Sequence, residues 1–290
     1  MVEKQNALSL KNRKIIKVTG EEATHFLQVL ITTDIKKMRP QELLPGALLS
    51  PQGKVVADFL ISKINKGYMI DIDALLADSF QKRLMLYKLR KEIEITQPLQ
   101  KDITICWENK ISISDSVLSF SDKRFPIKEK VLRYYGKTSL SAPKRNDNWD
   151  RMRIRYAIAE SGHDYEIGKV FPHDINYDQI NGLALNKGCY IGQEVISRMH
   201  HRKIIRRRLL IVKSRYNLTP GSTVTAGAKK LGQLGTCATN EALALMRIDH
   251  VKDAMNENIQ ITVDNLPVTI NIPENVNFTF PESTAETADG

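Results

Sequence analysis

The pattern of hydrophobic and polar positions predicts alternating strands and helices in the first part of the chain. "RKIIKVTG" (13–20) reads as a strand, and the helix predicted after it carries Phe26, Leu27 and Leu30 on one face. Thr19 and Glu22 have the spacing of a capping box at the start of that helix. Residues 43–73 then read as several strands, separated by Pro-Gly, Pro-Gln-Gly and Asn-Lys-Gly turns.

Two further helices are expected. Asp73 can cap a helix over 74–91 whose apolar residues recur at helical spacing. That apolar face consists of Leu76, Phe80, Leu84 and Tyr87. Residues 92–96 and 103–122 read as strands, and a third helix is expected over 146–162, with Asn148 as its cap and Gly162 as its stop.

From about Arg206 the chain reads as short strands punctuated by glycine and asparagine, which is typical of a small β-barrel or sandwich. The order of elements indicates an α+β fold of two α+β halves around antiparallel sheets, and not a doubly wound parallel sheet. The predicted domains are 1–110 and 111–205 for the two halves and 206–273 for the barrel. Residues 274–290 contain four acidic residues and no basic ones, which predicts a disordered tail.

The 290 residues carry a net charge of +10, which favours acidic partners such as nucleic acid, an anionic membrane or a polyanionic ligand. Solubility alone would explain the charge equally well. No apolar run is long enough to span a bilayer, and the N-terminus lacks the apolar core of a secretory signal. We therefore expect a cytoplasmic protein without a membrane partner. The three cysteines lie far apart, which argues against a disulfide framework or a self-contained metal site.

"KGCYIGQE" (187–194) is the candidate site, because it places one thiol among glycines just before a predicted helix. A cysteine reacts as the thiolate, which nearby positive charge favours. Lys187 and Arg198 could supply that charge, and Glu194 could pair with Arg198 at i and i+4. The remaining candidates shape the site: Gly188 leaves the thiol uncovered, Gly192 permits a tight turn, Tyr190 offers a stacking face and Gln193 a hydrogen-bonding amide. The alternative is a small buried cysteine beside structural glycines.

Residues 198–208 contain six Lys or Arg and no acid, so they could bind phosphate or a glutamate tail, or could form a solvated connector. His200 and His201 are expected on a solvated face. No aromatic residues interleave this stretch, which disfavours a stacking platform for nucleic acid. No phosphate-binding glycine loop is present either.

The site residues resemble a known family. "KGCYIGQEVISRMHHR", preceded by "FPHDINYDQINGLALN", is similar to the signature of YgfZ-type folate-binding proteins, which are relatives of the glycine-cleavage T-protein and assist the maturation of iron–sulfur enzymes. The resemblance extends over "LITTDIKKMRPQELLPGALLSPQGKVVADFLI", "YKLRKEIEI" and "LGQLGTC…ALALMR", from about residue 10 to about residue 272.

The resemblance implies two ferredoxin-like halves and a C-terminal β-barrel in a ring around a central channel. Tetrahydrofolate is expected in that channel, with Cys189 at its wall and Asp58, Asp71, Asp174 or Glu160 as candidate partners of the pterin. It further implies a monomeric accessory factor whose partners are iron–sulfur client enzymes and cluster-carrier proteins. A cluster could be held only transiently, with a partner, because one cysteine cannot ligate it alone.

One departure from the T-protein pattern bears on the activity. T-proteins carry paired aspartates where this chain has "GKVVAD", so Ala57 replaces the first carboxylate and Asp58 keeps the second. The first carboxylate is the one expected to assist aminomethyl transfer. Aminomethyltransferase activity therefore stays as an alternative to the accessory function. A basic module for tRNA binding or modification, with a steep salt dependence, is a second alternative supported by charge alone.

Overall fold

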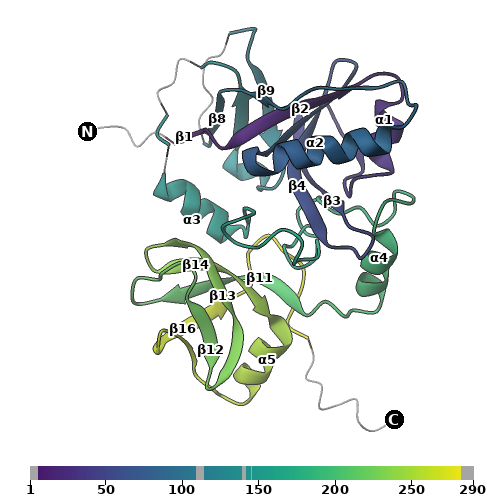
Figure 1. The fold of residues 1–290 in the computed structure, drawn as a ribbon. Coiled ribbons are helices and arrows are strands. Elements are labelled where there is room, and N and C mark those ends of the chain that lie inside the picture. The colour runs from purple at the N-terminus through teal and green to yellow at the C-terminus, as the bar shows by residue number, and fades with distance from the viewer. Residues whose placement is uncertain (1–5, 109–113, 139–141, 145, 282–290) are drawn as a thin grey trace. The chain divides into compact units, whose positions relative to one another are not determined.

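The computed structural model describes residues 6–108, 114–138, 142–144 and 146–281. These residues form two compact units (Figure 1). Unit 1 contains residues 1–149 and 180–197, and unit 2 contains residues 150–179 and 198–290. Within the described residues, no helix is both long enough and apolar enough to cross a bilayer.

Unit 1 is built on one large sheet, in which neighbouring strands run β1-β8-β10-β9-β3-β4-β5-β2-β6, with β7 also on β2. All its pairs are antiparallel except β3 with β9. The strands are β1 (Ala7–Leu10), β2 (Arg13–Thr19), β3 (Glu42–Leu49), β4 (Val55–Ile64), β5 (Gly67–Asp73), β6 (Glu94–Ile95), β7 (Leu99–Gln100), β8 (Ile103–Cys106), β9 (Leu118–Asp122) and β10 (Leu132–Tyr135). The sheet thus joins strands that the sequence analysis assigned to separate halves.

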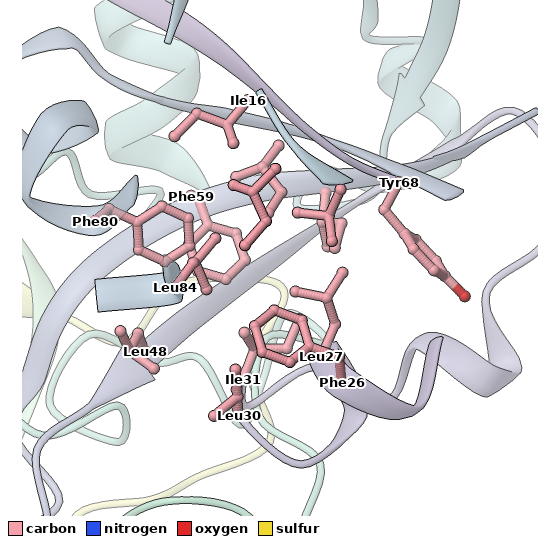
Figure 2. Packing of buried hydrophobic residues seen from close by; sticks show 14 of the residues in the cluster. Ile16, Phe26, Leu27, Leu30, Ile31, Leu48, Phe59, Tyr68, Phe80 and Leu84 are labelled. Atoms are coloured by element: carbon pink, nitrogen blue, oxygen red, sulfur yellow. The ribbon is translucent and has the colours of Figure 1, made fainter. Parts of the chain in front are cut away.

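Helices α1 (Ala23–Gln28) and α2 (Ala74–Lys88) cover one face of this sheet and enclose its main hydrophobic cluster. In Figure 2, Phe80 and Leu84 of α2 lie close to Phe59 of β4, with Phe26 and Leu27 of α1 in the same cluster. Phe59 and Phe80 have ring centroids 5.1 Å apart. The short 3₁₀ helix η1 (Ile35–Lys37) follows α1.

The caps of these helices agree with the sequence only in part. Asp73 caps α2 as predicted, since its carboxylate accepts a hydrogen bond of 2.8 Å from the backbone N–H of Leu75. The capping box at α1 is wrong. Thr19 ends strand β2, and the carboxylate of Glu22 accepts instead from the backbone N–H of Glu92 at 2.7 Å. Tyr87, predicted on the apolar face of α2, is 37% exposed and is not among the residues of the cluster that Phe80 and Leu84 join.

A buried ionic network lies beside a smaller apolar cluster of the sheet. Asp71 is fully buried and accepts hydrogen bonds from Arg13, Arg133 and Tyr135. Arg133 also donates to Asp122, which Arg124 contacts through two nitrogens. Ion pairs removed from water in this way depend on all their members, because a single remaining charge would be uncompensated.

Unit 2 contains the closed barrel β11-β14-β13-β12-β15-β16. Its elements are β11 (Arg207–Ser214), β12 (Thr223–Ala226), β13 (Lys229–Ala238), β14 (Glu241–Arg247), α5 (Ile248–Asn256), β15 (Ile261–Val263) and β16 (Leu266–Asn271). Residues 150–179 attach to it through polar contacts: Arg208 of β11 pairs with Asp178, and Asp164 accepts from the backbone N–H of Thr236 in β13 at 2.7 Å. Asp164 approaches Gly235 so closely that a side chain there would collide with it.

The predicted α+β class with a C-terminal β-barrel is confirmed, whereas the ring with a central channel and the domain boundaries stay predictions. Helix α3 (Asp147–Arg155) is shorter than predicted. It ends well before Gly162, and the side chain of Asn146, not Asn148, accepts the capping bond, from the N–H of Asn148. The remaining helix, α4 (Gln193–His201), begins four residues after Cys189.

The predicted disorder is wrong for the first part of the tail. Phe278 and Phe280 pack against the barrel core, and Arg208 lies 4.7 Å from the ring of Phe278. Residues 274–281 are fixed further by the ion pair of Glu274 with Arg155 and by the hydrogen bond from the N–H of Asn277 to Gln179. Residues 282–290 and 109–113, part of a predicted strand, lie outside the described residues.

Candidate functional site

The segment 182–187 is bound to the loop that follows α1. The Lys187 ammonium donates to the carbonyl oxygens of Gln28 and Thr33, both at 2.7 Å. The Thr32 hydroxyl donates to the carbonyl of Gly182, and the N–H of Ala184 donates to the carbonyl of Thr32. Burial lowers the pKa of Lys187 to about 8. Its role in the structure is therefore to fix the loop to α1.

Gln193 and Gly192 fix the other end of the loop. The Gln193 side chain accepts from the N–H of Tyr190 at 3.3 Å and donates to the carbonyl of Leu185 at 3.1 Å. Gly192 has φ of +78°, and a Cβ there would lie 2.5 Å from the carbonyl oxygen of Ser50. Only glycine combines this backbone conformation with so close an approach. The loop is thus held at both ends, with Cys189 between them.

Cys189 is exposed on this anchored loop. Gly188 before it has φ of +92° and open space where a Cβ would lie, so position 188 places no side chain beside the thiol. Of the three cysteines, all within the described residues, the other two are less accessible: Cys106 is buried and Cys237 is half-buried. Burial raises the pKa of the Cys106 thiol to about 11 and that of the Cys237 thiol to about 12. The alternative of a buried structural Cys189 is therefore wrong.

The other predicted site residues differ in exposure: Tyr190 and Asp58 are buried, whereas Glu194 and Arg198 are exposed. Tyr190 is buried under the Lys187 ammonium, which lies 5.1 Å from the ring centroid, so its ring is not free to stack on a ligand. Burial raises the pKa of the Tyr190 hydroxyl. Glu194 and Arg198 are exposed on α4, one helical turn apart. Asp58 is buried in β4, opposite Ala47 of β3.

Ala57 belongs to the hydrophobic cluster under α1 and α2 and is 1% exposed. Alternation along β4 turns Asp58 to the opposite face of the sheet. The position of the first T-protein aspartate is thus an alanine packed in the core, and no carboxylate replaces it there.

A cleft of about 430 Å³ lies beside the loop, and sequence reasoning did not find it. Leu183, Ala184, Leu185 and Asn186 form one wall, directly before Lys187. Its polar lining residues are Thr33, Asp34, Lys37, Glu42, Lys123, Asn181 and Asn186. "TTD" after the first predicted helix and the asparagines before "KGCY" were visible in the sequence. Only the fold brings them together.

Two of the carboxylates considered for the pterin are used internally. Asp71 is held by two arginines and a tyrosine, and Asp174 accepts from Arg207 at 2.6 Å and from the N–H of Phe171. In unit 2, His200 and His201 are exposed as expected, and the ring of His200 stacks on the buried His173. The described residues contain no group of three His, Cys, Asp or Glu side chains placed to hold a metal ion.

Comparison with known proteins adds to this geometry. Residues 206–278 match the family described as "CAF17, C-terminal beta-barrel domain". The chain is 25% identical over 280 residues to the human mitochondrial iron–sulfur cluster assembly factor IBA57, covering 85% of this chain and 79% of that protein. The chain is similar to IBA57 assembly factors. The IBA57 homologue of Chaetomium globosum is 26% identical over 237 residues, but the chain spans only 54% of its length.

Among solved structures, the aminomethyltransferase T of the glycine cleavage system from Bartonella henselae has the same fold. The TM-score is 0.68 over 94% of this chain and 87% of that one, at 12% sequence identity. The likeness to IBA57 also corrects one prediction. The expected cytoplasmic location is wrong, because these relatives are described as mitochondrial. A basic composition is compatible with either compartment, so it could not decide between them.

Proposed function

We propose that this chain assists the assembly of iron–sulfur proteins, with Cys189 supplying one sulfur ligand to a cluster that a partner protein also holds. One observation carries the proposal: the chain's single exposed thiol projects from a loop anchored at both ends. The likeness to IBA57, a named iron–sulfur cluster assembly factor, supports it.

The geometry explains why such a site needs a partner. Clusters are held by several thiolates, and the described residues provide one accessible sulfur. An incomplete ligand set binds the cluster weakly enough to release it, whereas a full set would store it. The anchored backbone keeps the thiol in position without covering it, so a second protein can approach. The cluster is therefore cargo, and carrier proteins and client enzymes are the proposed partners.

Tetrahydrofolate is the proposed small-molecule ligand. A pterin ring presents N–H groups that suit carboxylates and amides, and the glutamate tail suits ammonium groups. The cleft beside the loop offers both: Asp34 and Glu42 suit the ring, and Lys37 and Lys123 suit the tail. Without a ligand these groups pair with one another, Lys37 with Asp34 at 3.5 Å and Lys123 with Glu42 at 3.4 Å, so folate would replace these pairs on binding. Its volume of about 430 Å³ lies in the range of small-molecule sites. Folate bound there would lie against the segment that leads into Cys189.

The function is tested directly by cluster transfer. Under anaerobic conditions, the full chain should accelerate delivery of a [2Fe–2S] or [4Fe–4S] cluster from a purified carrier to an apo-enzyme, measured as recovered enzyme activity. We expect at least about a tenfold rise in initial rate, equivalent to about 1.4 kcal/mol of barrier. Equal rates with and without the chain would refute the function.

Folate binding is tested separately by calorimetric titration of tetrahydrofolate. The wild-type chain should bind, and Asp34→Asn should weaken binding about tenfold or more, because a charge-assisted hydrogen bond is lost while the residue keeps its shape. Asp78→Asn, on the exposed side of α2, is the control and should leave Kd unchanged. Equal affinity of the wild-type and Asp34→Asn chains would remove the pterin from this cleft.

A further inference from the structure

The C-terminal end of α2 exposes a group of large apolar side chains. Leu86 is 74% exposed, Leu89 is 84% exposed and Met85 is 46% exposed. Met85 and Leu86 lie in the last turn of the helix, outside the buried face that packs on the sheet, and Leu89 follows directly after the last helical residue. Single exposed leucines are ordinary, but a group of large exposed apolar side chains marks a contact surface.

Positive charge surrounds these side chains. Lys82, Arg83 and Arg90 are exposed, and none of them forms an ion pair with the part of the chain that the structure describes. Of the two carboxylates that flank this segment in the sequence, Asp78 pairs with Lys14, and Glu92 lies two residues beyond Arg90. No acidic residue lies between Asp78 and Glu92. We call Lys82, Arg83, Met85, Leu86, Leu89 and Arg90 the α2 patch.

Leu89 adds an independent observation. It follows the last residue of α2 with φ of +50° and ψ of −119°. Glycine adopts this conformation readily, and a leucine is strained in it. The chain therefore bears a backbone strain that holds an apolar side chain in water. Neither the backbone strain nor the exposed leucine side chain stabilises the isolated protein. Strain of this kind occurs where a side chain is held in the orientation that a contact requires.

We propose that the α2 patch docks an acidic protein whose surface has an apolar pocket rimmed by carboxylates. Leu86 and Leu89 enter the pocket, and the three cations of the patch face the rim. The strain at Leu89 favours a protein over an anionic membrane, because only a shaped pocket requires one fixed side-chain direction. Methionine and arginine are also enriched in protein interfaces. The identity of the partner rests on the proposed function, which makes the acidic protein an iron–sulfur cluster carrier.

The experiment measures cluster transfer against carrier concentration. Leu86→Glu places a carboxylate against the rim and should raise the carrier concentration for half-maximal rate at least about tenfold, with an unchanged maximal rate. Leu75→Glu is the matched control, since Leu75 is 93% exposed at the other end of the same helix, and should change neither. Leu89→Gly should weaken docking while raising Tm by about 2–4 °C, because the strain is relieved.

The other outcomes of this experiment would contradict the docking surface, the proposed function or the choice of a protein partner. Half-maximal concentrations that stay at the wild-type value in Leu86→Glu and Leu89→Gly, or an equal rise in Leu75→Glu, would overturn the docking surface and leave the proposed function standing. A wild-type chain that accelerates no transfer would instead overturn the function and with it the partner. Patch-dependent flotation with vesicles of equimolar phosphatidylcholine and phosphatidylglycerol, together with carrier docking that ignores the patch, would assign the surface to a membrane.

Discussion

Replacing Cys189 with alanine should abolish complementation of a strain that lacks this chain, with iron–sulfur enzyme activity falling to the level of the empty strain. Cys189 is exposed, so the variant loses no core packing, and its free energy of unfolding should stay within about 0.5 kcal/mol of wild type. Sulfur is the soft ligand that iron–sulfur clusters require, and neither alanine nor a neighbouring side chain supplies it. Activity should therefore fall without a loss of protein.

Cys237→Ala is the matched control, because it removes a thiol whose pKa burial raises to about 12 and which is half-buried in the barrel. Complementation by this variant should match wild type. The measurement is enzyme activity per amount of client protein, alongside immunoblots for the chain itself. Full complementation by Cys189→Ala would remove the thiol from the function, whatever the resemblance to the relatives implies.

Asp71→Ala should lower the free energy of unfolding of unit 1 by about 3–5 kcal/mol, because it leaves Arg13 and Arg133 buried without their shared carboxylate. Both tryptophans of the chain, Trp107 and Trp149, lie in unit 1, so urea unfolding followed by tryptophan fluorescence reports on this unit. The midpoint should shift strongly to lower urea.

Asp102→Ala is the control for this result. Its pair with Lys11 has a similar length of 3.0 Å, but both side chains are more than half exposed, so the loss should stay below about 1 kcal/mol. Similar losses of unfolding free energy in the two variants would show that the buried network stabilises unit 1 no more than an exposed ion pair does.

The same network predicts sensitivity to acid. Burial alone would raise the pKa of Asp122, but the guanidinium groups of Arg124 and Arg133 offset this and hold the pKa at about 2. A carboxylate with a lowered pKa in the folded state stabilises the fold above its unfolded pKa of about 3.9, and the contribution is lost as pH falls toward 2. Unit 1 should therefore lose stability between about pH 4 and pH 2.

Patterns that extend over a few neighbouring residues were enough for much of the fold. Asp73 before the apolar spacing of α2 predicted the helix and its cap, and the short strands after Arg206 predicted the barrel. The same reasoning failed where a distant contact competed with a local one. Glu22 satisfies the backbone of Glu92 instead of closing a capping box, and Phe278 binds the barrel within a segment of acidic composition.

The sequence by itself singled out the candidate site, since "KGCYIGQE" stands out without any coordinates. Only the tertiary structure decided what each of its residues does. Lys187 was expected to supply charge to the thiol, yet it bonds to Gln28, 159 positions away. Gly192 was expected to permit a turn, but only the fold shows that it also packs against Ser50. Exposure of the sulfur, burial of Asp71 and the strain at Leu89 likewise depend on which distant segments the folded chain brings near. A local sequence pattern does not indicate which distant segments will lie against it in the folded chain.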